Sequence, residues 1–261
     1  MTLKEARAEF FLKSRIEGLE KIRQAIESGD DKDEIVTEMK EKTKALIRRL
    51  EEHAHGRKDR KEPIDTKSLM DEEGVLASDD VVLLRRMRKE DHAMYHQLFM
   101  EQEVNPQEEA IEGIFESNLS DENLYCTIFT VADGTPIGYC GIKYVDEDPA
   151  ELAVELLKAY HRQGFGYRAL WLYMDALKKA GVQDYIAMID ADNVASQRLF
   201  EKLGARLCGL TEYMLYTKEE RDKFEEMFAS LVSPNMEQLA QRLSTKPKKL
   251  LSRAVKYELS A

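Results

Sequence analysis

The chain of 261 residues contains little cysteine, and its three cysteines do not form a disulfide pattern. Cys126, Cys140 and Cys208 are scattered, odd in number and embedded in apolar, strand-like runs. Small secreted domains that depend on disulfides normally carry an even number of cysteines at characteristic spacings. We therefore interpret all three as reduced cysteines in the core of a cytoplasmic protein.

The sequence also lacks long apolar runs and a surplus of basic residues. No run of about 18 apolar residues is present, which argues against a transmembrane helix and a membrane partner. The segment that begins at Met1 has no apolar h-region, so we expect no signal peptide. In the whole chain, 50 aspartates and glutamates outnumber 39 lysines and arginines, which gives a net charge of −11. Because duplex phosphates require a basic surface, we expect no nucleic-acid partner.

Residues 1–55 have the apolar periodicity of helices. Thr2 and Glu5 match a capping box, and apolar residues then recur every three or four positions over residues 12–26 and again over residues 35–50. This pattern predicts a helical hairpin appendage. The hairpin serves either as a packing element or as an arm that forms a homodimer, and the sequence leaves both readings open.

The remaining chain divides into three segments. Residues 56–80 are charged and aperiodic, and we predict a linker. Residues 81–217 alternate between strand and helix patterns, and residues 218–261 are predicted to be a helical extension with a last strand at 253–260. Strands are predicted at 81–87, 124–132, 137–145, 150–157 and 184–190, with two more over 205–217, and helices at 89–101, 105–119, 166–181 and 193–204. This order predicts an α/β fold in which helices cover one mixed sheet.

Two glycines stand between a predicted strand and a predicted helix in the stretch LLKAYHRQGFGYRAL (156–170). Glycine in a helix costs about 1 kcal/mol relative to alanine, so these positions require a compensating advantage. Without Cβ atoms, Gly164 and Gly166 would allow backbone N–H groups to approach a phosphate, whose charge the helix dipole favours. The alternative is a helix start that packs beneath a crossing element.

Two blocks of this core resemble the GNAT superfamily of acyl-CoA-dependent N-acetyltransferases. The block ELAVELLKAYHRQGFGYRAL (151–170) is similar to the family's coenzyme-binding strand, loop and helix. The block DADNVASQRLFEKLGARLCG (190–209) is similar to the strand and helix that follow. The resemblance covers about residues 80–217 and is closest to the branch of ribosomal-protein alanine acetyltransferases. It implies a GNAT-like fold and acetyl transfer from acetyl-CoA, without a metal, to the primary amine of a small molecule or peptide in a ternary complex.

The resemblance also assigns residues to coenzyme binding. They are Leu156, Leu157, His161, Arg162, Gln163, Gly164, Phe165, Gly166, Tyr167, Asn193, Ser196 and Phe200. Two positions depart from the family pattern. His161 stands where the family usually has arginine or glutamine. Phe200 stands where many members have a tyrosine whose hydroxyl protonates the departing thiolate, so this chain needs another donor or none.

Two carboxylates in the predicted strand at 150–157 are candidates for general-base catalysis. Glu151 and Glu155 point to the same face of a strand, and an acceptor amine must lose a proton before it attacks. A salt bridge from Glu155 to an arginine on a covering helix is an equally good reading. His92 and His96 have the spacing of a helical metal pair, but no third ligand is evident, and we expect no metal site.

Three functions therefore remain open on the sequence. The first is an acetyl-CoA-dependent N-acetyltransferase. The second is a module that binds coenzyme A without turnover, which the replacement of tyrosine by Phe200 keeps open. The third is a helical interaction protein that carries a decayed transferase and binds no coenzyme.

Overall fold

The computed structural model describes the chain except for residues 29–36, 38–57, 60–63, 103–107, 213–216 and 261. The described residues belong to two compact units. The larger unit comprises Lys58–Ile189, Asn193–Gly209 and Lys256–Ala261. The smaller unit comprises Met1–Arg57, Asp190–Asp192 and Leu210–Val255.

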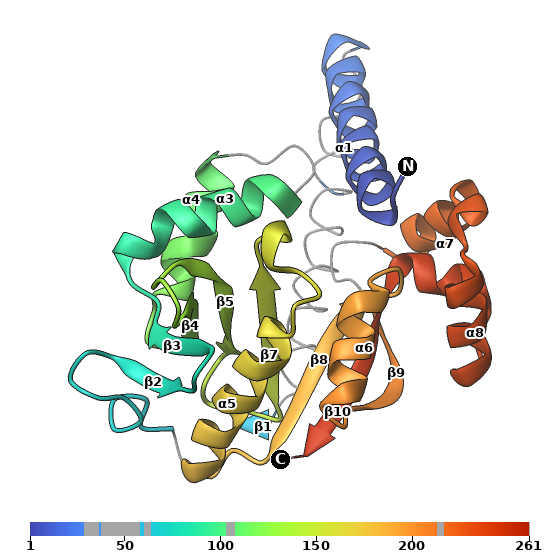
Figure 1. Cartoon of the computed structure of the whole chain (residues 1–261). Helices are drawn as coiled ribbons and strands as arrows, with labels where there is room; N and C mark the ends of the chain where they lie inside the picture. Colours follow the sequence, from blue (N-terminus) through green and yellow to red (C-terminus); the bar gives the residue numbers. More distant parts are fainter. Residues whose placement is uncertain (29–36, 38–57, 60–63, 103–107, 213–216, 261) are drawn as a thin grey trace. The chain divides into compact units, whose positions relative to one another are not determined.

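Helices and strands are interspersed along the described chain (Figure 1). The α-helices are α1 (Leu3–Ser28), α3 (His92–Gln102), α4 (Glu108–Asn118), α5 (Phe165–Lys179), α6 (Val194–Lys202), α7 (Lys218–Met227) and α8 (Pro234–Arg242). The strands are β1 (Lys58–Asp59), β2 (Val75–Ser78), β3 (Val82–Arg86), β4 (Leu124–Thr130), β5 (Pro136–Lys143), β6 (Glu147–Asp148), β7 (Ala150–Leu156), β8 (Asp184–Asp190), β9 (Arg206–Glu212) and β10 (Arg253–Ser260).

Among the described residues, eight strands form one mixed sheet in the order β2-β3-β4-β5-β7-β8-β10-β9. The strands from β2 to β7 pair antiparallel, whereas β7 and β8 are parallel. That parallel pairing joins Ala150 to Tyr185 and Glu151 to Ile186, and the two strands then diverge (Figure 1). The mixed α/β sheet expected from the sequence is therefore confirmed, with the described pairing of β8 at the first residues of β7.

The two faces of this sheet are covered by different helices. Helix α5 lies on the face of Val154 and Leu156, since a Cβ on Gly166 would stand 3.9 Å from Val154 Cγ2 and 3.5 Å from Leu156 Cδ1. Alternate residues of a strand point to opposite faces, and Ala153 packs into a core cluster shared with α3 and α4. The buried members of that cluster are Met87, Met94, Tyr95, Leu98, Ile111, Phe115, Tyr125, Tyr139 and Leu157.

Helix α5 is also joined to the sheet by a buried tyrosine. The hydroxyl of Tyr173 donates to the carbonyl oxygen of Leu124 at 2.6 Å and accepts the N–H of Ile142 at 3.1 Å. Both partners are backbone groups of neighbouring strands, so the bonds fix the helix along the sheet. The helix ends before Gly181, whose φ of 83° is the left-handed conformation that commonly closes a helix.

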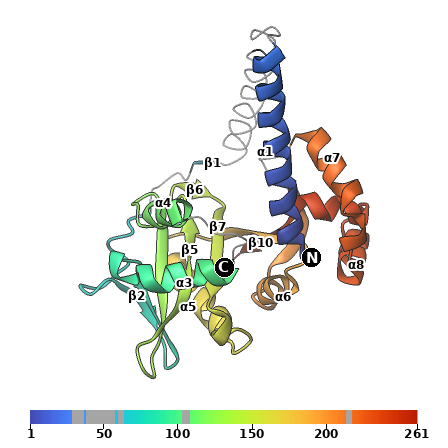
Figure 2. The ribbon, with the colours of Figure 1, turned by 90° about the horizontal axis from the view of Figure 1, so that it is seen from above.

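The smaller unit brings the N-terminal helix together with the C-terminal helices. The ring centroids of Phe10 in α1 and Phe224 in α7 lie 5.3 Å apart, and Figure 2 shows α7 beside α1. The guanidinium group of Arg7 donates to the carbonyl oxygen of Leu251 at 2.8 Å and pairs with Asp190 at 2.8 Å. Residues 1–28 are therefore an integral part of this unit.

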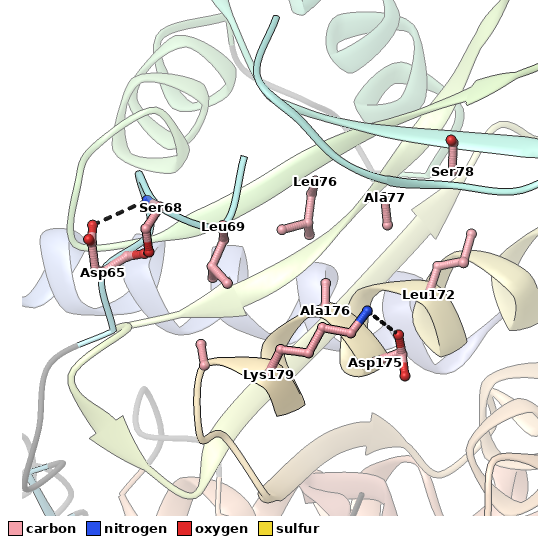
Figure 3. A pocket seen from close by; sticks show the side chains of 11 residues that line it. Asp65, Ser68, Leu69, Leu76, Ala77, Ser78, Leu172, Asp175, Ala176 and Lys179 are labelled. Carbon is pink, nitrogen blue, oxygen red and sulfur yellow. Dashed lines mark hydrogen bonds and ion pairs between the residues drawn. The ribbon is translucent and has the colours of Figure 1, made fainter. Parts of the chain in front are cut away.

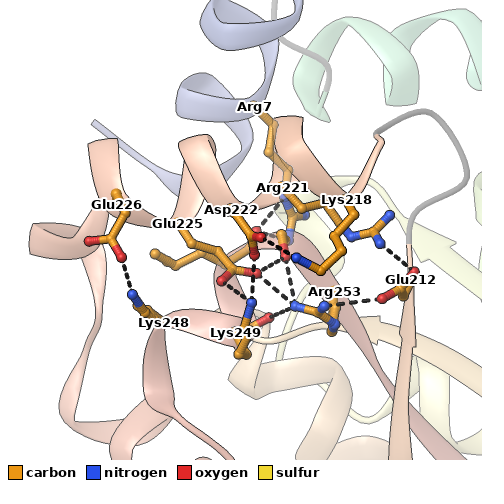
Figure 4. Close-up of polar contacts among 12 residues, drawn as sticks. Arg7, Glu212, Lys218, Arg221, Asp222, Glu225, Glu226, Lys248, Lys249 and Arg253 are labelled. Atoms are coloured by element: carbon orange, nitrogen blue, oxygen red, sulfur yellow. Dashed lines mark hydrogen bonds and ion pairs between the residues drawn. The ribbon is translucent and has the colours of Figure 1, made fainter.

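A network of charged side chains holds the C-terminal part of the smaller unit (Figure 4). Glu225 is only 1% exposed, and its carboxylate accepts from Ser252 at 2.6 Å and from Arg253 and Lys249 at 2.7 Å each. Arg221, which is also buried, pairs with Glu212 at 2.6 Å. The network links α7 to the chain that leads into β10 and to the end of β9.

Most helices and strands agree with the sequence patterns. The capping box is confirmed, since Glu5 accepts the N–H of Thr2 at 2.6 Å and Thr2 accepts the N–H of Glu5 at 3.2 Å. Ser233 caps α8 with Pro234 in its first turn, and the last predicted strand is β10. The predicted helix over residues 35–50 lies almost wholly outside the described residues, as do Asn105 and Pro106.

Two expectations need correction. Residues 75–78 of the predicted linker form strand β2, which pairs with β3 at the edge of the sheet. Cys208 is exposed rather than part of a core, although Cys126 and Cys140 are buried, and all three thiols are free. Of the two strands predicted over residues 205–217, the first is β9, and residues 213–216 lie outside the described part of the chain.

Candidate active site

The loop between β7 and α5 is tied to its surroundings by three short hydrogen bonds. Nε2 of His161 lies 2.7 Å from the carbonyl oxygen of Leu156, so this nitrogen carries the hydrogen. The side chain of Gln163 donates to the carbonyl oxygen of Ala159 at 2.7 Å. Glu101 of α3 accepts the N–H of Lys158 at 2.8 Å, and this bond lowers the pKa of Glu101. The side chains of His161 and Gln163 therefore shape the loop itself.

The start of α5 has two residues in the left-handed conformation. Arg162 has a φ of 59° and Gly164, the N-cap residue, has a φ of 89°. No side chain caps the helix, and among the described residues the N–H groups of Phe165, Gly166 and Tyr167 have no hydrogen-bond acceptor. A run of backbone N–H groups in such conformations, at the positive end of a helix dipole, is suited to bind an anion.

The two glycines differ in backbone conformation and in surroundings. A Cβ on Gly164 would meet nothing within 4 Å, and this glycine is needed for its left-handed backbone. Gly166 is buried, and a Cβ there would stand 3.5 Å from Leu156 and 3.5 Å from Leu199. Gly166 therefore serves the close packing of α5 against β7 and α6.

At the end of β7, successive backbone N–H groups point to opposite edges of the strand. The N–H of Leu157 donates to the carbonyl oxygen of Ile137 in the chain at β5, at 2.9 Å. Because N–H groups alternate between the two edges of a strand, Leu156 directs its N–H to the opposite edge. Of the two predicted contacts for the pantetheine arm, the backbone of Leu156 has the suitable direction, and Leu157 is buried in the core.

Helix α6 carries the remaining predicted coenzyme residues. Asn193 is its N-cap, with the side-chain oxygen accepting the N–H of Ser196 at 3.0 Å. Phe200 is 3% exposed and belongs to the packed interior. It has no hydroxyl to offer a leaving group. Thus Asn193 and Ser196 are engaged with each other, and Phe200 contributes apolar surface.

Glu151 and Glu155 share the face of the sheet that is covered by α3 and α4. Glu155 lies directly across from Tyr139 in the pairing of β7 with β5, and Glu151 lies across from Lys143. Both carboxylates are partly exposed. A hydrogen bond with Glu155 is one of the causes that raise the pKa of the buried Tyr139, after burial and the negative charge of Glu155 itself.

A second tyrosine stands on the same face. A Cβ on Gly141 would lie 2.5 Å from Cδ1 of Tyr125, so only glycine leaves room for this ring on β5. The pKa of Tyr125 is raised by burial and then by the charges of Glu151 and Glu155. Sequence reasoning missed Tyr139, because its position opposite Glu155 depends on how β5 pairs with β7.

His92 and His96 each contact a carboxylate of the neighbouring helix α4. His92 pairs with Glu112 at 2.7 Å and His96 with Glu108 at 3.1 Å. In the part of the chain that the structure describes, no group of three or more histidine, cysteine, aspartate or glutamate side chains is placed to hold a metal ion. Nor does any described helix have the length and apolar character needed to cross a membrane.

A pocket of about 700 Å³ opens between α5 and residues 65–78 (Figure 3). Leu76 and Leu172 contribute apolar surface, and the ion pair of Asp175 and Lys179, at 2.9 Å, borders it. None of the predicted site residues lines this pocket. The glycine loop and the carboxylates of β7 are therefore a separate feature of the larger unit.

Comparison with known proteins agrees with this arrangement. The family model described as Acetyltransferase (GNAT) domain matches residues 81–206, which include β7, the glycine loop, α5 and α6. No match was found among the curated proteins compared.

Several solved structures are similar to this chain. A ribosomal L7/L12 alpha-N-protein acetyltransferase has 14% identity and a TM-score of 0.50, with 72% of this chain and 94% of that chain covered. The ribosomal-protein-S18-alanine N-acetyltransferase from Escherichia coli has 19% identity and a TM-score of 0.46, covering 69% and 93%. An acetyltransferase (GNAT family) from Bacillus anthracis has 14% identity and a TM-score of 0.47, covering 70% and 96%. The likeness to the first of these structures, at a TM-score of 0.50 and 14% identity, shows the fold alone.

Proposed function

Because the chain belongs to the GNAT family of acetyltransferases through its domain at residues 81–206, we propose that it transfers the acetyl group of acetyl-CoA to a primary amine by direct attack in a ternary complex. The observation that carries this proposal is the start of α5. There the loop that resembles the family's coenzyme site coincides with first-turn N–H groups that no side chain caps. Such a helix start holds phosphate through its N–H groups and its dipole.

The proposed coenzyme site combines backbone and side-chain groups. The N–H groups of residues 163–167 would hold the pyrophosphate, with Arg162 and Tyr167 beside it. The backbone of Leu156 would pair with the amide-bearing pantetheine arm as an added strand does. Its N–H would then also stabilise the thioester oxygen as charge develops there. Asn193 and Ser196 at the start of α6, with Phe200, would border the arm.

Acetyl transfer forms a bond between the amine nitrogen and the acetyl carbon and breaks the bond between that carbon and the coenzyme sulfur. A lysine-like amine has a pKa of about 10.4, so its nitrogen must lose a proton to react at neutral pH. We assign the acceptance of that proton to Glu155, with Glu151 on the same face as a second carboxylate. Since a thiol has a pKa of about 8.5, the sulfur can leave as thiolate, and no proton donor is needed at the position that Phe200 occupies.

A coenzyme A-binding module without turnover is the second candidate function. The observation that favours it is Phe200, which is buried and lacks the hydroxyl that many family members place there. A third candidate, a helical interaction protein with a decayed transferase, requires that the start of α5 bind no coenzyme.

Calorimetric titration with coenzyme A and an assay of free-thiol release from acetyl-CoA separate these functions. The amine panel includes a peptide with an N-terminal alanine, a lysine peptide, a polyamine and an aminoglycoside. We expect binding together with amine-dependent release of thiol. Binding without release for any amine supports the module, and absence of binding supports the interaction protein.

Glu155→Gln tests the assignment of the base in the same assay. Removing a general base is expected to lower kcat by a factor of about 10²–10⁴ while leaving the affinity for coenzyme A unchanged. Glu151→Gln is the matched variant on the same strand and face, and its effect should be smaller. Equal rates for wild type and Glu155→Gln would show that this carboxylate does not take the proton.

A further inference from the structure

The side chains around Glu155 are ordered by three strands that lie next to one another. The pairings join Thr127 of β4 to Tyr139 of β5, and Tyr139 to Glu155 of β7. Side chains that lie directly opposite on one face of antiparallel strands have Cβ atoms about 4.5–5.5 Å apart. The phenol of Tyr139 therefore lies within reach of the Glu155 carboxylate through the pairing of the strands alone.

The ring of Tyr139 is held from several sides. It lies 5.6 Å from the ring of Tyr95 in α3 and 5.6 Å from the ring of Tyr125 in β4, measured between centroids. Tyr139 is 7% exposed, and the hydroxyl of Tyr95 is itself fixed by Asn118 at 3.2 Å. A phenol confined in this way has little freedom to leave its hydrogen-bond partner.

We propose that Tyr139 is a positioning residue for Glu155: its hydroxyl donates a hydrogen bond to the carboxylate and holds it where it receives the proton of the acceptor amine. This inference rests on the proposed acetyl transfer. Tyr139 exchanges no proton in the reaction. The amine proton goes to Glu155, the nitrogen–carbon bond forms, and the carbon–sulfur bond breaks.

The direction of the hydrogen bond agrees with its effect on Tyr139. A phenol that donates to a carboxylate is disfavoured from ionising, both by loss of the bond and by the nearby negative charge. Together with burial, these causes raise the pKa of Tyr139 well above its ordinary value. The hydroxyl therefore keeps its hydrogen across the physiological range and remains a donor.

Kinetics of Tyr139→Phe, Glu155→Gln and the double variant test the proposal. A misplaced catalytic group commonly costs a factor of ten or more, so we expect Tyr139→Phe to lower kcat by roughly tenfold with unchanged affinity for coenzyme A. In the Glu155→Gln background the same substitution should have no further effect. If Tyr139→Phe lowered kcat equally in the wild type and in Glu155→Gln, or in neither, the positioning role would be overturned.

Tyr125→Phe is the matched control, because it removes a hydroxyl from the same aromatic cluster without removing a hydrogen bond to Glu155. We expect its kcat to remain within about twofold of wild type, since the buried ring is retained. A loss as large as that of Tyr139→Phe would mean that any change in the cluster lowers the rate, which contradicts a specific role for Tyr139.

A second measurement does not depend on activity. In protein labelled with ¹³C at tyrosine Cζ, the signal of Tyr139 is assigned by its disappearance in Tyr139→Phe. We expect Glu155→Gln to shift this signal and Glu151→Gln to leave it in place. An unchanged signal in Glu155→Gln would overturn the proposal, whereas a shift in a protein that acetylates no amine would contradict only the proposed function.

Discussion

The start of α5 in the larger unit and the charged network of the smaller unit differ in whether their polar groups have partners within the protein. Buried Glu225 accepts from Ser252, Arg253 and Lys249, so its charge is compensated within the protein. The first-turn N–H groups of α5 have no acceptor among the described residues. Paired buried charges serve the fold, because an uncompensated one is costly. Donors left unpaired at a helix start are available to a ligand.

The largest loss of stability is expected on removing Glu225, the buried carboxylate with the most complete set of partners. Glu225→Ala leaves Arg253 and Lys249 without their buried partner and should lower the free energy of unfolding by about 3–5 kcal/mol. Glu226→Ala, the neighbouring residue in α7, removes an exposed carboxylate that pairs with Lys248 and should cost at most about 1 kcal/mol. Urea unfolding measures both. Equal losses for the two variants would remove the distinction between buried and exposed pairs.

The second prediction concerns the unpaired groups. Gly164→Ala strains a left-handed residue by about 1–2 kcal/mol and turns the N–H groups away from the phosphate. Loss of one charged hydrogen bond, about 1.5–3 kcal/mol, weakens coenzyme A binding by a factor of at least about ten. Thermal melts and calorimetric titration are the measurements.

Gly134→Ala is the matched control for that strain. Gly134 has a φ of 69° in the turn of the β4–β5 hairpin, and a Cβ there would also meet nothing within 4 Å. Both variants should therefore lose similar stability, and Gly164→Ala alone should lose affinity for coenzyme A. If Gly134→Ala weakened binding as much, general destabilisation would explain the effect.

The smallest effect is expected at the bond that anchors the loop before α5. The pKa of Glu101 is lowered because its carboxylate accepts the N–H of Lys158. The stability that the ionised form adds is fully present above the ordinary value of 4.5 and is lost as the pH falls through the lower value in the folded protein.

Glu101→Gln should accordingly cost less than about 1 kcal/mol at pH 7, because the carboxylate is partly solvated. The difference from wild type should shrink as the solution is acidified below pH 4.5. Glu109→Gln, an exposed carboxylate in α4, is the control and should match wild type throughout. A cost for Glu101→Gln that stays constant with pH would mean that its charge is not involved.

Local patterns allowed much of the fold to be predicted. Apolar, strand-like runs marked β4, β5 and β7, and the spacing of Leu170, Tyr173 and Leu177 marked α5. Strand β2 was not predicted, because its four residues lie beside several acidic residues and take their stability from pairing with β3. The packing of Phe10 on Phe224 escaped because periodicity indicates an apolar face but not its distant partner.

The candidate site was predictable to a similar extent. The glycine loop and the cap at Asn193 are local features, and both lie in the family's blocks. The separate roles of Gly164 and Gly166 needed the backbone angle of one and the neighbours of the other. The position of Tyr139 opposite Glu155 depends on how β5 pairs with β7, which a one-residue change of register would reverse.

Amide signals in ¹⁵N-labelled protein, recorded with and without acetyl-CoA, test most directly whether the unpaired groups of α5 bind the coenzyme. We expect the largest shifts at the N–H groups of residues 163–167 and none at residues 218–227 of the charged network. Unchanged signals at residues 163–167, under conditions where calorimetry shows binding, would place the coenzyme elsewhere and contradict the proposed site.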